Sequence, residues 1–227
     1  MTVDLRLGDC LEVIKSLPTA SIDAVITDPP FFTPAVHYQS RVSWGRCLGD
    51  LSILGQFFFD LAVEWKRVIK SDGHLLVFCH DESYPVFYPV TFGMWDSSKA
   101  LVWDKTRIGL GRTFRHQFEL ILWAHDKQAY TNEHGKVHSN VLKYSPTLSK
   151  DRDHPVQKPP ELIRELIEVC TRTDATILDC FMGSGTTGEA CVNLGRNFIG
   201  VEINEGYFNI SKKRIEEAQQ QLAMNLG

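Results

Sequence analysis

Short apolar runs typical of β-strands alternate along this sequence with longer amphipathic runs typical of helices, and this alternation constrains the fold more than any other feature. We expect strands over residues 21–27, 73–79, 176–181 and 197–202, and helices over 51–70, 159–172, 187–194 and 205–222. Two more strand-like runs, 100–103 and 118–124, enclose a stretch rich in glycine and arginine and predict an antiparallel hairpin. Strands separated by helices predict an α/β fold with a doubly wound, mostly parallel sheet, and we expect the hairpin near one edge.

The chain has 227 residues and shows no internal repeat, low-complexity tract or linker, so we expect residues 1–227 to form a single domain. Its apolar runs are far shorter than the roughly 20 residues of a membrane-spanning helix. The opening residues lack the basic and apolar regions of a signal peptide. None of the six cysteines forms a Cys-x-x-Cys pair. We therefore expect reduced thiols in a cytoplasmic protein.

Charge is distributed unevenly along the chain. The net charge is −4, but the segment 99–158 holds 11 Lys and Arg against 6 Asp and Glu, which gives it +5 and leaves −9 for the rest. A locally basic surface is compatible with contacts to nucleic-acid phosphates. The same charges are equally typical of a solvated basic loop, so charge alone leaves both interpretations open.

The first motif that indicates chemistry is a glycine-rich turn that follows an expected strand. Its sequence is Asp179-Cys-Phe-Met-Gly183-Ser-Gly185-Thr-Thr187, and Glu202 ends the next strand 19 residues after Gly183. Glycines there let the backbone turn sharply and approach a ligand closely, and a carboxylate at Glu202 can accept hydrogen bonds from ribose hydroxyls. Because 183–188 also fits the Gly-x-Gly-x-x-Gly pattern, the turn alone leaves a nicotinamide or flavin enzyme open.

The second motif, Asp28-Pro29-Pro30-Phe31, follows the expected strand 21–27. An exocyclic amine of a nucleic-acid base is a weak nucleophile, because its lone pair is delocalised into the ring. Asp28 and the Pro29 carbonyl could each accept one N–H bond and free that lone pair for attack on a methyl group. Phe31 could stack on a base taken out of its helix. The alternative is a strand that ends in a polar turn with a core phenylalanine, and the glycine turn elsewhere in the chain weakens it.

Together the two motifs resemble those of the DNA amino-methyltransferases, in the permuted order called the β class. There the Asp-Pro-Pro-aromatic motif precedes the glycine loop, as Asp28 precedes Gly183 here. The resemblance covers most of the chain and implies a seven-stranded Rossmann-like sheet, S-adenosylmethionine as cofactor, and double-stranded DNA as substrate with the target base flipped out. It also implies adenine N6 as the target, because the family tends to place serine at position 28 for cytosine N4.

The resemblance implies roles for individual residues. Leu7-Gly-Asp9 resembles the end of the family's N-terminal strand, whose acid contacts the cofactor adenine. His154-Pro-Val-Gln-Lys158 resembles a motif beside the methionine part of the cofactor, and 102–105 with 115–119 resembles the hairpin that flanks the target base. The residues expected to bind the cofactor are Asp9, Lys158, Asp179, Phe181, Gly183, Ser184, Gly185, Thr186, Thr187 and Glu202. The expected catalytic residues are Asp28, Pro29, Pro30 and Phe31.

The part of the chain expected to face DNA departs most from the family. The family more often has tyrosine where Phe31 stands, but stacking needs only the ring. Only about residues 126–153 are available for target recognition, which in the family is often a subdomain, so we expect a short or relaxed recognition sequence. Tyr38 and Arg41 are candidates for a loop that closes over the flipped base. The expected DNA contacts are Lys105, Arg107, Arg112 and Arg115.

Several alternatives stay open from the sequence. Cytosine N4 methylation uses the same geometry, and an RNA base could replace the DNA base. The chain could also be a non-catalytic nucleic-acid-binding subunit with an active partner, although the two intact motifs speak against this, and a homodimer is compatible with the sequence. His134 and His138 have the spacing of two metal ligands on a helix, but Gly135 and the loop-like surroundings favour no metal site. An enzyme of this kind could serve restriction–modification, phage protection or epigenetic marking.

Overall fold

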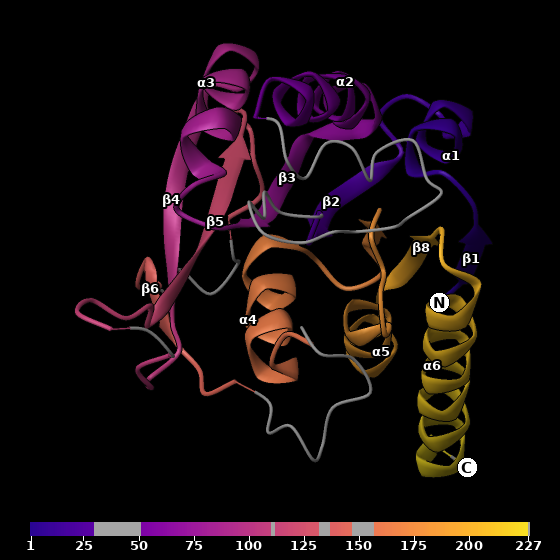
Figure 1. Cartoon of the computed structure of the whole chain (residues 1–227). Helices are drawn as coiled ribbons and strands as arrows, with labels where there is room; N and C mark the ends of the chain where they lie inside the picture. Colours follow the sequence, from indigo (N-terminus) through magenta and orange to yellow (C-terminus); the bar gives the residue numbers. More distant parts are fainter. Residues whose placement is uncertain (30–50, 110–111, 132–136, 147–156, 227) are drawn as a thin grey trace.

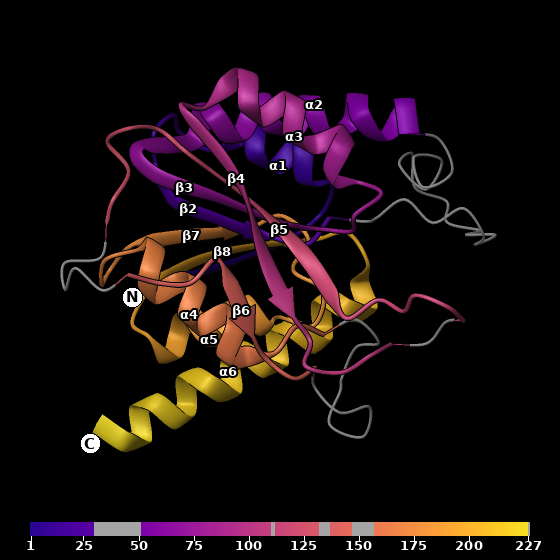
Figure 2. The ribbon, with the colours of Figure 1, turned by 90° about the vertical axis from the view of Figure 1, so that its left-hand side faces the viewer.

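The computed structural model describes residues 1–29, 51–109, 112–131, 137–146 and 157–226. They form an eight-stranded sheet with the strand order β1-β8-β7-β2-β3-β5-β4-β6. The strands are β1 (Val3–Leu7), β2 (Ile22–Thr27), β3 (Ile69–Cys79), β4 (Ser97–Asp104), β5 (Phe118–His125), β6 (Val141–Lys143), β7 (Thr176–Asp179) and β8 (Asn197–Glu202). Helices α1 (Cys10–Ser16), α2 (Leu51–Val68) and α3 (Tyr84–Met94) cover one face, and α4 (Pro160–Cys170), α5 (Thr186–Asn193) and α6 (Glu205–Leu226) cover the other (Figure 1, Figure 2). No helix within these ranges is long and apolar enough to cross a membrane.

Each face of the sheet has its own hydrophobic core. Under α1–α3, Trp65 and Phe58 are fully buried, and the Phe58 ring stacks on Phe87 at a centroid distance of 3.8 Å. Under α4–α6, Phe198 of β8 and Ile215 of α6 are buried in the second core. Because full burial of one such side chain contributes roughly 1.5–3 kcal/mol, the two cores hold the sheet between its helices.

Strand direction decides which loops meet. Five adjacent strands run parallel to one another, in the order β1-β8-β7-β2-β3. Strand β5 runs antiparallel to both β3 and β4. The carboxyl ends of β1, β8, β7 and β2 therefore lie side by side at one edge of the sheet, here called the carboxyl edge. β4 ends and β5 begins at the same edge. Ligands of open α/β sheets bind at an edge of this kind.

The predicted doubly wound sheet and its hairpin are confirmed, with two differences. The sheet has eight strands rather than seven, because β6 pairs in parallel with β4 inside the region predicted to be loop, where Leu142 is buried. β3 begins at Ile69, before the expected start at 73. The pairing of β3 with β2 shifts between Ile69 and His74. A Cβ on Gly73 would lie 2.7 Å from the Asp23 carbonyl oxygen, so glycine allows this close approach.

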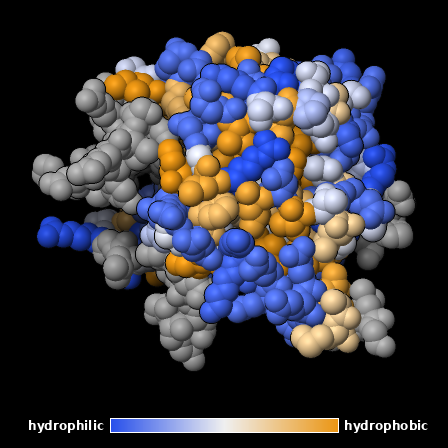
Figure 3. Space-filling model, turned by 90° about the vertical axis from the view of Figure 1, so that its right-hand side faces the viewer, coloured by the Kyte–Doolittle hydropathy of each residue, from blue (hydrophilic) through white to orange (hydrophobic). Residues whose placement is uncertain are grey.

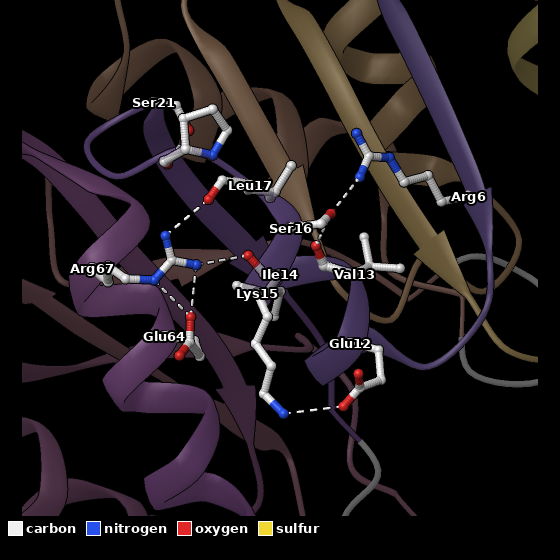
Figure 4. Close-up of polar contacts among 11 residues, drawn as sticks. Arg6, Glu12, Val13, Ile14, Lys15, Ser16, Leu17, Ser21, Glu64 and Arg67 are labelled. Carbon is white, nitrogen blue, oxygen red and sulfur yellow. Dashed lines mark hydrogen bonds and ion pairs between the residues drawn. The ribbon is translucent and has the colours of Figure 1, made fainter.

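Helix α1 is positioned from both ends. Asp9, which follows β1, is its N-cap, and Asp9 Oδ1 accepts a hydrogen bond from the helix backbone at 2.9 Å. At the other end, the Arg67 guanidinium from α2 donates to the carbonyl oxygens of Ile14 and Leu17, each at 2.8 Å (Figure 4). Arg67 also pairs with Glu64, which fixes the guanidinium. Because a helix of seven residues is too short to be stable alone, these contacts keep Asp9 at the carboxyl edge.

Strand β1 is an outermost strand of the sheet, and its charged side chains disfavour pairing with another chain. The Asp4 carboxylate and the Arg6 guanidinium lie 2.8 Å apart. Arg6 also donates to the Ser16 hydroxyl of α1 at 3.0 Å (Figure 4). Hydrophilic side chains lie among the apolar ones on this side of the molecule (Figure 3). Charges on an edge strand disfavour pairing with a strand of another chain.

Candidate active site

The carboxyl edge brings together the segments that the sequence singled out. Asp28 directly follows β2, the glycine loop follows β7, Glu202 ends β8, and Asp9 follows β1. β2 and β7 are hydrogen-bonded neighbours, with Ala24 opposite Ile177. The two predicted motifs, far apart in the sequence, therefore lie on adjacent strands.

Thr27 and Asp179 join the two motifs directly. The Thr27 hydroxyl donates to Asp179 Oδ1 at 2.8 Å across 152 residues of sequence, and it accepts a hydrogen bond from the Cys180 amide at 3.1 Å. Asp179 also accepts hydrogen bonds from the Phe181 amide at 3.1 Å and from the Thr187 side chain. Burial raises the pKa of Asp179 to about 6, although these donors oppose the rise. Asp179 thus organises the start of the glycine loop from inside the protein.

The glycine loop requires left-handed backbone at Gly183 and Gly185, whose φ angles are 52° and 83°. An added Cβ on Gly185 would lie 2.8 Å from the Ser211 Cβ in α6, so glycine allows the loop to approach this helix. Among the described residues, an added Cβ on Gly183 would meet only the Phe181 carbonyl oxygen, at 3.9 Å. Glycine at 183 therefore leaves the loop backbone open to a ligand.

Glu202 and Asp9 supply carboxylates on the adjacent strands β8 and β1. Glu202 Oε2 accepts a hydrogen bond from the Gly183 amide at 2.9 Å, and Oε1 accepts one from the Asn204 amide at 2.8 Å. Burial raises the pKa of Glu202, and these backbone donors oppose the rise. The Gly8 amide donates to the Glu202 carbonyl at 2.9 Å, which sets Asp9 on the neighbouring strand end. Two carboxylates beside an open glycine loop fit the hydroxyl and amino groups of the nucleoside in S-adenosylmethionine.

The other predicted cofactor residues lie in the glycine loop or begin α5. Ser184, Thr186 and Thr187 are buried, and Gly185 is the N-cap of α5. The Phe181 ring packs edge to face against Phe57 of α2, with centroids 6.3 Å apart. Because these side chains are buried or packed against other residues, we expect the loop backbone to make the contacts with a cofactor. Their individual contacts with it stay predictions.

An ionic cluster surrounds Asp28. Asp28 Oδ2 lies 2.7 Å from Lys158 Nζ, which also lies 3.0 Å from Glu119 Oε2. Glu119 Oε1 in turn lies 2.6 Å from Lys105 Nζ. Lys158 and Glu119 are each only 6% exposed. Asp28 Oδ1 is also buried, and it has no hydrogen-bond partner among the described residues.

Burial and neighbouring charges act in opposite directions on this cluster. Burial raises the pKa of Asp28, Lys158 opposes the rise, and Glu119 adds to it. Burial also acts to raise the pKa of Glu119, but Lys158 and Lys105 outweigh it and lower that pKa. For Lys158, burial acts to lower the pKa, and the two carboxylates outweigh it and raise the pKa. The protein therefore holds one lysine cation between two carboxylates.

Part of the predicted site lies outside the described residues. Pro30 and Phe31 of the catalytic motif fall there, as do Tyr38, Arg41 and His134. Pro29 is described and is buried. His138, considered with His134 as a metal ligand, has its Nδ1 3.2 Å from Glu165 Oε1. Within the described ranges, no group of His, Cys, Asp and Glu residues has the arrangement of a metal site.

The basic loop between β4 and β5 starts and ends at the carboxyl edge. Arg107, Arg112 and Arg115 are exposed in it, and Arg115 Nε donates to the Gly109 carbonyl at 2.6 Å. Phe114 is 98% exposed beside them. An exposed ring among arginines is a surface that suits nucleic acid. Lys105 differs from the three arginines because Glu119 holds its ammonium, and its contact with DNA stays a prediction.

Two residues of the site, Thr27 and Glu119, were not predicted from the sequence. Thr27 carries no signal, since its partner Asp179 lies 152 residues away. Glu119 did carry one, because it stands in the run Phe118-Glu-Leu-Ile-Leu-Trp-Ala124, which is otherwise apolar. An acid within a buried strand requires a charged partner. That requirement points to a cation such as Lys158.

Comparison with known proteins identifies the family. The model of the N6/N4 methyltransferases, described as DNA methylase, matches residues 22–213. The chain is 28% identical to the Type II methyltransferase M.HinfI of Haemophilus influenzae, over 92% of this chain and 67% of that protein. It is 24% identical to the DNA adenine methyltransferase YhdJ of Escherichia coli (strain K12), over 97% of this chain and 85% of that protein.

Solved structures agree with this assignment. The complex of M1.HpyAVI with S-adenosylmethionine matches with a TM-score of 0.71 and 26% identity, over 94% of this chain and 100% of that chain. The cytosine-N4-specific PvuII DNA methyltransferase matches with a TM-score of 0.75 at 18% identity, over 97% and 92% of the two chains, which shows the shared fold. These findings confirm the predicted fold, family and cofactor. The chain belongs to the N6/N4 DNA methyltransferase family, whose members transfer a methyl group from S-adenosylmethionine to DNA.

Proposed function

We propose that this chain methylates the N6 amine of adenine in double-stranded DNA, with the target base flipped out of the helix. The observation that supports this most is Asp28 Oδ1, which is buried without a hydrogen-bond partner among the described residues, next to the strand that carries the glycine loop. A buried carboxylate oxygen requires a donor, and an exocyclic amine is a donor. The likeness to the DNA adenine methyltransferase YhdJ supports adenine as the base.

The residues of the chain act on the amine, while S-adenosylmethionine supplies an electrophilic methyl group. Asp28 accepts one N–H bond of the amine and the Pro29 carbonyl accepts the other, which draws the nitrogen toward tetrahedral geometry and localises its lone pair. As the nitrogen forms its new bond to the methyl carbon, the bond between that carbon and the sulfonium sulfur breaks and the sulfur keeps the electron pair. The nitrogen becomes positively charged and gives up one proton. The Asp28 carboxylate, which accepts one of the N–H bonds, is the proposed acceptor for that proton. Positioning and electrostatics therefore supply most of the rate enhancement.

The basic loop between β4 and β5 supports binding of the DNA backbone. Arg107, Arg112 and Arg115 are exposed at the edge of the sheet that carries Asp28, so phosphates on either side of the flipped base are their proposed partners. The recognition region, about 126–153, is short, and we propose that the recognition sequence is short or relaxed. Mapping of methylated positions in a genome measures this, and a strict site of about six or more base pairs would contradict it.

The reaction is tested by mass spectrometry of nucleosides after incubation of unmethylated DNA and RNA with deuterated-methyl S-adenosylmethionine. We expect labelled N6-methyldeoxyadenosine from the wild-type protein, no label from Asp28→Asn, and full label from Asp60→Asn, the same change on the exposed side of α2. Labelled N4-methyldeoxycytidine would replace adenine by cytosine as the target. The absence of any labelled base, despite binding of S-adenosylmethionine, would refute the catalytic role and favour a partner-dependent subunit.

Three broader expectations remain proposals. A homodimer is measured by light scattering of the purified protein at several concentrations. A cytoplasmic location is measured by fractionation of the source cells. A single domain over residues 1–227 predicts one cooperative unfolding transition, and two separate transitions would contradict it.

A further inference from the structure

The proposed reaction needs one carboxylate, yet two carboxylates share one lysine inside this site. We propose that Lys158 is a positioning residue for Asp28, and that Glu119 is a positioning residue for Lys158. This inference rests on the proposed role of Asp28. It gives Lys158 a function different from the contact with the methionine part of the cofactor that the family resemblance implies, and it gives Glu119 a function that the sequence did not suggest.

The contacts of Asp28 show what Lys158 does. Lys158 Nζ lies 2.7 Å from Oδ2, so one carboxylate oxygen is occupied and the rotation of the carboxylate is fixed. The other oxygen, Oδ1, remains buried and without a partner among the described residues. Asp28 therefore presents a single oxygen in a fixed direction, as acceptance of one amine N–H bond requires.

The contacts of Lys158 show what Glu119 does. Glu119 Oε2 lies 3.0 Å from Lys158 Nζ. The ammonium also lies 5.0 Å from the centre of the Phe78 ring and 5.9 Å from that of Trp103. In such apolar surroundings a charge keeps its place only when opposite charges hold it. Glu119 is itself held by Lys105 on its other oxygen, at 2.6 Å.

Stability alone is a weak explanation for this cluster. Buried ion pairs are often replaceable by apolar residues at no loss of stability, because removal of the charges from water offsets their attraction. Here the ion pair of Lys158 and Glu119 lies next to Asp28, and the proposed reaction requires a set direction and a negative charge for the Asp28 carboxylate. The charged and titratable groups that act on Asp28 from the elements around it are Lys158, Glu119, His80, Cys79 and Asp179.

The two substitutions have opposite electrostatic effects on Asp28. Lys158 lowers the pKa of Asp28 and Glu119 raises it. Lys158→Met should therefore move the acid limb of the pH–rate profile to higher pH, and Glu119→Gln should move it to lower pH. A residue with a merely structural role would move neither limb in a direction set by its charge.

The experiment compares the wild-type protein with Lys158→Met, Lys158→Arg, Glu119→Gln and the matched control Glu168→Gln, an exposed glutamate of α4. Steady-state rates are measured with DNA from about pH 5 to about pH 9, which gives the pH–rate profile. S-adenosylmethionine is varied at neutral pH, so that kcat and the KM for S-adenosylmethionine are obtained separately. Carboxyl-carbon NMR, with the signal assigned through Asp28→Asn, follows the titration of Asp28 without any turnover.

We expect Lys158→Met to lower kcat about a hundredfold at neutral pH, the effect of a misplaced catalytic group, with the KM for S-adenosylmethionine unchanged. Its Asp28 signal should titrate at higher pH, and that of Glu119→Gln at lower pH. Lys158→Arg keeps the positive charge, so the acid limb of its pH–rate profile should lie at the wild-type pH. Glu168→Gln should match the wild-type protein. If Lys158→Met fails to fold, the double variant Lys158→Met with Glu119→Gln removes one charge of each sign. Asp28 should still titrate at higher pH in the double variant than in the wild-type protein, because Lys158 acts on it more strongly than Glu119 does.

Two results would overturn the inference. The first is an Asp28 titration that is the same in all variants. The second is a Lys158→Met protein with wild-type kcat and a raised KM for S-adenosylmethionine, which would place Lys158 at the cofactor instead. Failure of the proposed function looks different, because the wild-type protein would then methylate no base while the NMR titration still reported on Asp28.

Discussion

His74 and Asp179 are buried groups whose protonation has opposite effects on stability, so replacing either one should expose the effect of the other. His74 Nδ1 accepts a hydrogen bond from Trp123 Nε1 at 3.1 Å, which leaves Nε2 protonated and donating to the Tyr130 carbonyl at 2.9 Å. Burial lowers the pKa of His74 to about 4. Burial raises the pKa of Asp179 to about 6.

The sign of each effect follows from the state that binds more protons. The pKa of His74 in the folded protein lies below its usual value of 6.5, so the unfolded chain binds more protons between about pH 6.5 and pH 4. Stability therefore decreases as the pH is lowered through this range. For Asp179 the folded pKa lies above the usual value of 3.8, so stability rises as pH falls from about 6 to 3.8. At about 1.4 kcal/mol per pKa unit, each effect reaches about 3 kcal/mol. Because the two pH ranges overlap, the loss of stability from His74 and the gain from Asp179 nearly cancel in the wild-type protein.

The assay is urea unfolding of the wild-type protein, His74→Asn and Asp179→Asn at about pH 7.5 and about pH 5. Relative to the wild-type protein, acidification should change the unfolding free energy by about +2 kcal/mol in His74→Asn and by about −1.5 kcal/mol in Asp179→Asn. Every other titrating group is common to the three proteins and cancels in this comparison. Equal pH dependence in His74→Asn and the wild-type protein would refute the reasoning, because it would mean that His74 titrates normally in the folded state.

Three further substitutions test other parts of the fold. Gly185→Ala should lower stability by about 2–5 kcal/mol, because alanine would be strained in left-handed backbone and would meet Ser211; an unchanged melting temperature would contradict this. Thr27→Val should lower the free energy of urea unfolding by about 2–4 kcal/mol, because it removes the hydroxyl that bonds both Asp179 and the Cys180 amide. The control Thr27→Ser keeps that hydroxyl and should stay near the wild-type value. Arg67→Met should cost about 1–3 kcal/mol and speed hydrogen exchange of the α1 amides; unchanged exchange would show that Arg67 does not hold α1.

The motifs at the carboxyl edge were predictable because their chemistry is local. Left-handed backbone favours glycine, as at Gly183, so a cluster of glycines in the sequence itself indicates a sharp turn. Asp28 is followed by proline, which ends a strand, so its place at a strand end also follows from neighbouring residues. The alternation of strands and helices then determines that both motifs lie at the same edge.

The remaining features of the site and fold depended on contacts between residues that are far apart in the sequence, or on elements with a weak sequence pattern. The family resemblance implied a cofactor contact for Lys158, and the hairpin implied a DNA contact for Lys105; both contacts stay predictions. A lysine in isolation gives no sign that Glu119 holds both ammonium groups. Strand β6 is only three residues long, too short for its alternation to stand out. Helix α3 contains Pro85 in its first turn, where proline is tolerated, and Pro89 inside it, where proline normally argues against a helix.

Strands β7 and β8 lie between β1 and β2 in the sheet, yet they are the last two strands of the chain. During synthesis on the ribosome, β1 has no neighbour until Asn197–Glu202 has emerged, and β2 lacks β7 until Thr176–Asp179 has. At about 5–20 residues per second, the first strand therefore waits for many seconds. The site is completed only after β8 has emerged, so an interrupted product that stops before β8 would lack both a finished sheet and Glu202, the acid predicted to bind the cofactor ribose. Such a fragment should modify no DNA.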